Sequence, residues 1–425
     1  MNARSIALIL VLVVAACPGF AAGEAIPAGP LSLQQCIALA MGSNTDVLVA
    51  RNDVIAAKSR SASALSSYLP QLTLQNNTFV WGSQNVLNKS TTGTAFEVTQ
   101  SIFDGGLREA KAQSARYGVT QSNAGLSRTQ QTVVYSISKA YYEHLRARHL
   151  AEVAQANVTY SEGLRDQIQA KAKEGDAARV DVLPIEAQLA SARVSLLSAN
   201  NTVRTSCIQL QNLLGLSPKT GFEVEDVSDS PVVDARSLDD YVAAAMKSRP
   251  DVMQSKAATG VARASVRSSR ISLYPRPVIS ANYQRQIQGG FTTSGTQMVG
   301  GIVFDIFNGG ANRAAYREAK ATQANAQLQE QQVGRDIRAQ VEEAYLNLTS
   351  AKERVSAGTA SFEAANNNYQ AQKERYAQGL GTTLDLLNAE VQVVTAQSDV
   401  VQARYDYYTA VAQMDYALGM QGGAK

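Results

Sequence analysis

The feature that most constrains how this chain can fold is an internal duplication. Phe103-Asp104-Gly105-Gly106 returns as Phe307-Asn308-Gly309-Gly310, an offset of 204 residues. The same offset relates further pairs: Ala140-Tyr141 and Ala344-Tyr345, Gly175 and Gly379, Asp181 and Asp385, Glu186 and Glu390, and Leu214-Gly215 and Leu418-Gly419. Similarity at one fixed offset indicates two copies of one structural unit. The predicted copies are 31–216 and 237–420, joined by a linker at 217–236.

Both copies show the same order of predicted elements. A helix of about 35 residues comes first, at 33–68 and at 238–274. Two strand-like stretches around a polar turn follow, then a very long helix, a glycine-containing turn and a closing helix. The expected ranges are a β-hairpin at 71–103, helices at 107–174 and 181–214, a second β-hairpin at 276–307, and helices at 311–378 and 382–418. The predicted fold class is α+β, dominated by long α-helices.

The long helices carry a seven-residue period. In the closing helix of the second copy, large residues recur at every seventh position and an alanine follows three positions after each of them. These residues are Leu386, Val393, Val400, Tyr407 and Met414, followed by Ala389, Ala396, Ala403, Ala410 and Ala417. A sustained period of seven indicates left-handed coiled packing. At a rise of ~1.5 Å per residue, the helix predicted at 107–174 is about 100 Å long. A compact globular core is therefore excluded, and a fibre, a bundle of rods or a tunnel wall remains.

The N-terminus is typical of an export signal. Arg4 precedes an apolar run from Ile6 to Ala16, which is too short to span a bilayer. The interpretation we favour is a signal peptide at 1–21, ending at Gly19-Phe20-Ala21. The alternative is a lipoprotein signal that ends before Cys17 and leaves that cysteine lipidated. Beyond the signal no apolar run reaches roughly 18 residues, so a membrane-crossing form would have to be a closed barrel.

The strand-like stretches alternate apolar and polar residues. Ile279, Ala281 and Tyr283, for example, are interleaved with Ser280 and Asn282. This pattern is typical of outer-membrane strands, although an ordinary two-faced sheet produces it too. Two hairpins supply four strands per chain, and the smallest membrane barrels need about eight. Three chains would supply twelve strands and a lumen, so the sequence predicts a homotrimer with a 12-stranded outer-membrane β-barrel above a helical tunnel.

Several motifs resemble those of a known family. Tyr68-Leu69-Pro70 ends the first helix, and the two Phe-Asp/Asn-Gly-Gly motifs open the long helices. The most specific motif is Arg375-Tyr376-x-x-Gly379, followed by Thr382-Thr383-Leu384-Asp385-Leu386-Leu387-x-Ala389. In these motifs and their order, nearly the whole mature chain resembles the TolC-like outer-membrane efflux proteins.

The resemblance implies a function. Members are trimers with a barrel in the cell outer membrane and an alpha-barrel tunnel in the periplasm. They passively conduct small molecules or proteins outward, in tripartite efflux or type I secretion systems. Their partners are a periplasmic adaptor (membrane fusion) protein and an inner-membrane pump of RND or ABC type. The alternative that the heptads alone allow is a periplasmic coiled-coil tethering protein without a pore.

The resemblance also implies an entrance at the turn between the long helix and the closing helix. Gly379 and Leu380 match the turn that the adaptor contacts, and Gly175 matches it in the first copy, where Asp176 replaces an apolar residue. Asp385 matches the first of two acidic residues that constrict the entrance, whereas Asn388 stands in place of the second.

Two further positions belong to the implied lock of the entrance. Tyr376 matches an aromatic residue of that lock, and Gly381 stands where a basic residue ties it.

Each gate residue also has a structural interpretation. Asp385 and Asp181 follow a turn, where a carboxylate favours a helix N-terminus. Tyr376 continues the seven-residue period of its helix.

The sequence argues against an enzyme and against several ligands. A net charge of +3, from 39 basic and 36 acidic residues, predicts no nucleic-acid partner. His144 and His149 are five apart on a helix and do not share a face, so we expect no metal site. No catalytic or nucleotide-binding motif occurs, and we expect no cofactor. Cys36 and Cys207 could pair in an oxidising periplasm, or both could be buried as small apolar residues.

Overall fold

The computed structural model describes residues 29–79, 91–174, 180, 182–217, 223–227, 236–288 and 291–420. The expected signal at 1–21 with Cys17 lies outside the described residues, as do Gly175, Asp176 and Asp181. Within the described part, no helix is both long enough and apolar enough to span a bilayer.

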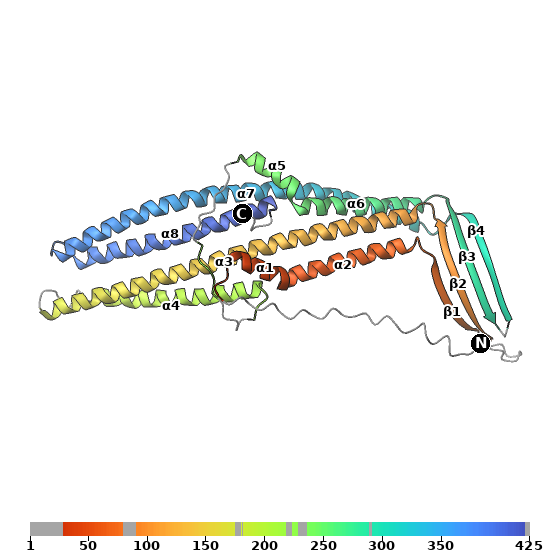
Figure 1. The fold of residues 1–425 in the computed structure, drawn as a ribbon. Coiled ribbons are helices and arrows are strands. Elements are labelled where there is room, and N and C mark those ends of the chain that lie inside the picture. The colour runs from red at the N-terminus through yellow and green to blue at the C-terminus, as the bar shows by residue number, and fades with distance from the viewer. Residues whose placement is uncertain are drawn as a thin grey trace.

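The molecule is elongated, with a sheet at one end and the α7–α8 turn at the other (Figure 1). The first copy contributes α1 (Leu33–Ser43), α2 (Thr45–Ser66), β1 (Gln71–Phe79), β2 (Thr91–Phe103), α3 (Leu107–Glu174) and α4 (Val182–Leu213). The second copy contributes α5 (Leu238–Ser248), α6 (Pro250–Ile271), β3 (Arg276–Gln288), β4 (Phe291–Val303), α7 (Ala311–Ala377) and α8 (Thr383–Leu418). Helix α3 packs against α2 and α6 in its half nearer the sheet, and against α4 and α8 in the other half.

The first helix of each copy is broken in two, where the sequence predicted one continuous helix. Asn44 adopts an extended backbone between α1 and α2, and its side chain caps α2 by accepting from the Asp46 and Val47 N–H groups. The Asn44 amide also donates to the Leu213 carbonyl at 2.9 Å. The break between α5 and α6 falls at Arg249, because the following Pro250 disfavours a helical conformation there.

The two glycines before α3 explain the Phe-Asp-Gly-Gly motif. Gly105 and Gly106 have φ of 76° and 92°, in the region that favours glycine. A Cβ on Gly105 would lie 2.9 Å from the Cβ of Arg276, so a larger residue is excluded sterically as well. Asp104 then accepts hydrogen bonds from the N–H groups of Gly106, Leu107 and Arg108 and so caps the long helix.

The four strands form one antiparallel sheet in the order β1-β2-β3-β4. The register places alternate residues on one exposed apolar face, made of Leu72, Leu74, Phe96, Ile279, Tyr283, Ile287, Met298 and Ile302. Within the part of the chain that the structure describes, strands β1 and β4 each have a single partner, so both edges of the sheet are unpaired there. β4 ends at Val303, short of the predicted hairpin end at 307, because Asp305, Asn308 and the glycines favour a turn.

The seven-residue period is confirmed as the seam of the helical core. All five alanines predicted on α8 are buried: Ala389, Ala396, Ala403, Ala410 and Ala417. The facing stretch of α7 buries Val341, Ala344, Leu348 and Ala351. A small residue at every seventh position lets the two backbones approach closely, which accounts for the dense α7–α8 packing.

Cys36 and Cys207, the cysteines among the described residues, are both unpaired thiols. Cys36 is fully buried on α1 and Cys207 is half-buried on α4. Burial raises the pKa of the Cys36 thiol to about 11. Of the two alternatives from the sequence, the structure therefore shows free cysteines rather than a disulfide.

Candidate functional site at the end of the helical hairpins

The α7–α8 turn lies at the end of the molecule remote from the sheet (Figure 1). Gly379 ends α7 with φ of 73°, the left-handed conformation of a helix C-terminus. The Gly379 N–H donates to the Tyr376 carbonyl at 3.1 Å, and the Leu380 N–H donates to the Arg375 carbonyl at 2.8 Å. These two bonds satisfy the last carbonyls of α7 and leave Leu380 67% exposed at the tip. The tip is therefore a hydrogen-bonded turn at which Leu380 is exposed.

Asp385 begins α8 through a reciprocal cap with Thr382. The Asp385 N–H donates to the Thr382 hydroxyl at 3.2 Å, and the Thr382 N–H donates back to the Asp385 carboxylate at 3.2 Å. The Thr382 hydroxyl donates to the same carboxylate at 2.7 Å. These bonds from Thr382 hold the pKa of the Asp385 carboxyl below its usual range, so it is charged at neutral pH. The helix-start role expected for Asp385 is thus present, and its side chain is still exposed to solvent.

Asn388 lies one turn after Asp385 on α8, and both side chains are exposed. Residues three apart on a helix share a face. Gly381 stands against the end of α7: a Cβ there would lie 3.2 Å from the Tyr376 backbone nitrogen. A basic residue at 381 would therefore need a small shift of this turn, and Arg375 instead donates to the Leu380 carbonyl at 3.4 Å.

Tyr376 links the two copies of the repeat. Its half-buried ring packs on an apolar cluster contributed by α3, α4 and α8, namely Leu164, Ile168, Ile185, Leu386 and Leu387. The Lys171 ammonium of α3 lies 4.8 Å from the centroid of the same ring, within cation–π range. Tyr376 is therefore both a seam residue and a contact between the ends of α7 and α3.

A second contact between the copies borders the same apolar cluster. The rings of Tyr160 on α3 and Tyr369 on α7 meet edge to face, with centroids 5.6 Å apart. Beside them the Ser161 hydroxyl donates to the Glu390 carboxyl at 3.3 Å. Glu390 is only 3% exposed, and burial raises its pKa to about 7. The sequence pattern paired Glu390 with Glu186 but did not reveal its burial, because position 390 is beside the seam and not on it.

A different cluster holds the far end of α8. The buried Arg249 guanidinium donates to the Ala417 carbonyl at 3.2 Å, to Gln340 at 2.9 Å, and to both oxygens of Asp251. The guanidinium of Arg128 lies 3.9 Å above the Tyr416 ring. These contacts tie α3, α6, α7 and α8 together at the middle of the molecule, at a point where the sequence predicted one continuous helix.

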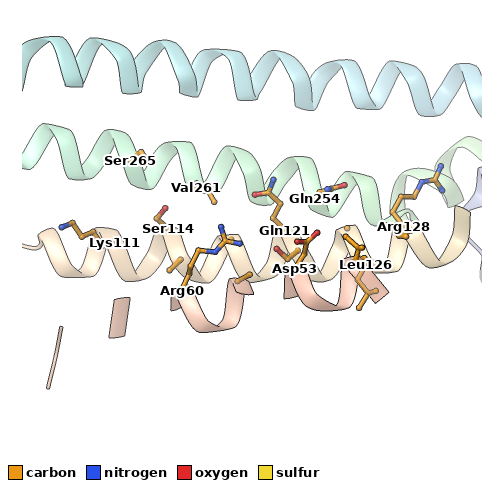
Figure 2. A pocket seen from close by; sticks show the side chains of 18 of the residues that line it. Asp53, Arg60, Lys111, Ser114, Gln121, Leu126, Arg128, Gln254, Val261 and Ser265 are labelled. Atoms are coloured by element: carbon orange, nitrogen blue, oxygen red, sulfur yellow. The ribbon is translucent and has the colours of Figure 1, made fainter. Parts of the chain in front are cut away.

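A groove of about 1190 Å³ follows α3 between α2 and α6. Figure 2 shows side chains from three helices pointing into it, including Asp53 and Arg60 of α2, Lys111 and Gln121 of α3, and Gln254 of α6. The lining of the groove carries both signs of charge.

The long edges of the helical layer carry exposed apolar side chains. On one edge these are Ile55 of α2 and Val194 and Leu197 of α4, and on the other they are Leu328 and Leu346 of α7. β1 continues from α2, and β4 leads into α7. Both the sheet and the helical layer therefore have two unlike edges that run along the same sides of the molecule.

These features define a channel-type protein: a long helical layer continued by an open sheet whose apolar face is exposed. The family model described as outer membrane efflux protein matches residues 36–216 and 242–420, and the chain belongs to this family. The predicted resemblance to TolC-like proteins and the predicted fold class are thereby confirmed. The family places the chain among outer-membrane efflux channels rather than periplasmic tethers.

Individual relatives agree with the family assignment. The chain is 26% identical to outer membrane efflux protein BepC of Brucella suis, over 82% of this chain and 76% of that protein. It is 23% identical to outer membrane protein TolC of Escherichia coli, over 91% and 82% of the two chains. Among solved structures, CusC superposes with a TM-score of 0.81 at 16% identity, covering 93% of this chain and 95% of CusC. The last similarity establishes the fold.

Proposed function

We propose that three copies of this chain close into one channel, with β1 of each copy paired to β4 of the next. The observation that carries the proposal is the pair of unpaired edge strands on a four-stranded sheet with an exposed apolar face. An open edge of this kind is a template for pairing with another chain. Three copies supply twelve strands, enough to enclose a lumen.

The helical edges fit the same ring. Strand β1 and helices α2 and α4 form one edge, and strand β4 and helix α7 form the other, so contact between copies joins unlike surfaces. Head-to-tail contacts of this kind close into a ring when the rotation that relates neighbouring copies adds up to a full turn. The apolar residues Leu197 on one edge and Leu346 on the other would then be covered by the neighbouring copy.

The channel conducts cargo passively outward from an inner-membrane pump of RND or ABC type, through a periplasmic adaptor protein. It needs no cofactor and catalyses no reaction, since the pump supplies the energy. The groove along α3 is proposed to face the lumen. Its mixed charges would keep this part of the conduit hydrated.

The α7–α8 turns form the periplasmic entrance. Three copies of Asp385 around the axis would create a negative ring that attracts cations. Asn388 lies beside that ring without adding charge, and Tyr376 holds the entrance narrow through its contact with Lys171. Gly379 and Leu380 form the tip that an adaptor contacts. Gly175 and Asp181, outside the described residues, are assigned the matching roles in the first copy.

Native mass spectrometry of the detergent-extracted protein tests the ring. The expected mass is that of three chains. Leu197→Glu or Leu346→Glu, on opposite edges, should each shift the population to monomers, whereas Asp239→Glu on the exposed face of α5 should not. A monomer or dimer from the unaltered protein, or trimers that survive both edge substitutions, would refute this arrangement.

A further inference from the structure

The buried carboxyl of Glu390 lies where the hairpins of the two copies meet. α8 carries Glu390, and α3 carries Ser161, the hydroxyl of which donates to one carboxyl oxygen at 3.3 Å. The other oxygen, Oε2, is buried and has no hydrogen-bond partner among the described residues. A charged oxygen without a partner in this position is strongly unfavourable, whereas a protonated carboxyl is far less so.

No charged group compensates this carboxyl within the described residues. The titratable groups beside it are the phenols of Tyr160 on α3 and of Tyr369 on α7, and burial raises the pKa of both. Ser161 contributes one neutral donor. The ionised form therefore has one hydrogen bond and no cationic neighbour, although it sits in the contact that holds α8 on α3.

We propose that Glu390 is a proton-binding site that controls the periplasmic entrance, with the protonated form stabilising the docking of α8 on α3 and the ionised form weakening it. This inference rests on the proposed channel function and adds a regulation to it. Leu386 and Leu387, one turn earlier on α8, belong to the apolar cluster under Tyr376. Loss of docking at Glu390 would therefore loosen the cluster that keeps the entrance narrow.

The direction of the pH dependence follows from the carboxyl's two states. In the docked state its pKa is about 7, raised by burial from an ordinary value of 4.5. A raised carboxyl pKa means that the docked state binds the proton more tightly than the undocked state. Docking is therefore strongest below pH 4.5, weakens about tenfold per pH unit as pH rises toward 7, and is weakest above it. Acidification on the periplasmic side closes the entrance.

The first copy of the repeat offers a matched control. Glu186 is the counterpart of Glu390 at the 204-residue offset, but it is exposed and accepts a hydrogen bond from Gln169 at 3.4 Å. Glu390→Gln mimics the protonated carboxyl in nearly the same shape. Glu186→Gln makes the same chemical change without a buried charge.

The first readout is hydrogen exchange of the purified trimer, because it does not depend on channel activity. At pH 8, amides of 155–168 and 386–396 should exchange more slowly in Glu390→Gln than in the unaltered protein, by a factor on the order of 100. At pH 5 the two proteins should exchange alike. Glu186→Gln should match the unaltered protein at both values. Equal exchange of Glu390→Gln and the unaltered protein at pH 8 would overturn the proposal even where channel activity is normal.

The second readout is single-channel conductance with only the periplasmic side titrated from pH 8 to pH 5. The mean open conductance of the unaltered protein should fall on acidification, while Glu390→Gln stays low throughout. Ser161→Ala removes the hydrogen bond that favours the ionised form of Glu390. The midpoint of the conductance change in this variant should therefore move to higher pH. If the conductance of Glu390→Gln still fell on acidification with the same midpoint as the unaltered protein, the proton site at Glu390 would be rejected. An unaltered protein without conductance would count against the proposed channel, and the exchange result would still decide the proton site.

Discussion

The ammonium group of Lys171 lies 4.8 Å from the centre of the Tyr376 ring and joins the end of α3 to the end of α7. The two residues belong to different copies of the repeat, so this contact crosses from one helical hairpin to the other. It stands beside the Schellman turn at Gly379, which fixes the direction of the tip. Among the described residues, the proposed entrance therefore has a cation–π contact that can be removed by a substitution in either α3 or α7.

Removing the ring should widen the entrance. Tyr376→Ala loses the cation–π contact and its packing on the apolar cluster, and should raise single-channel conductance. Lys171→Met should raise it less, because a cation–π contact at a partly exposed site contributes about 0.5–1 kcal/mol. Tyr376→Phe keeps the ring and serves as the control. Conductance that is the same in all three variants would show that this contact does not hold the entrance.

The charge at the tip should set ion preference. Asp385→Asn retains a capping side chain at the start of α8 but removes the negative charge, so cation preference should fall sharply. The reversal potential in a salt gradient at pH 7 measures this. Thr382 holds the pKa of Asp385 below its ordinary value. The negative charge of Asp385 and its contribution to the helix cap should therefore be fully present above the ordinary pKa, and be lost only as pH falls through the lowered pKa. Asp239→Asn on α5 is the control. An equal shift of the reversal potential in both variants would show that Asp385 does not line the pore.

The alanine seam should not tolerate larger residues. Ala396→Leu inserts three carbon atoms between α7 and α8 and should destabilise the fold by about 1–3 kcal/mol. The same change at the exposed Ala360 of α7 is the control for helix propensity and hydrophobicity. Thermal denaturation of the purified protein compares them. Equal stability of the two variants would argue that the seam is loosely packed.

The buried guanidinium of Arg249 should be essential for stability. Arg249→Ala leaves the Ala417 carbonyl and Gln340 without their donor, and should cost about 3–5 kcal/mol. Arg249→Lys should restore little, since one ammonium cannot reproduce the planar contacts to Asp251 and Gln340. A melting temperature close to that of the unaltered protein in either variant would contradict this role.

Local pattern in the sequence predicted much of the helical core. The seven-residue spacing on α8 identified the buried alanines, because a period along one helix reports directly which face is covered. The 204-residue offset by itself predicted that the turn at Gly379 has a counterpart at Gly175. The Phe-Asp-Gly-Gly motif marked the start of α3, where Asp104 caps the first turn.

Features that depend on contacts between distant parts of the chain were missed. The sequence predicted one continuous helix across Arg249. The break at Asn44 is held by a contact in which the Asn44 amide donates to the carbonyl of Leu213, far along the chain. Glu390 is beside the seam, so its burial depends on how α3 lies across α8. The period of a single helix contains no information about that crossing.

The central claim is that copies of this chain assemble into a conducting channel, and single-channel recording in planar bilayers tests it most directly. Purified trimer should give discrete, cation-preferring steps that grow larger in Tyr376→Ala. Protein that associates with the bilayer as a trimer but gives no steps in either form, or protein that fails to associate at all, would contradict the account.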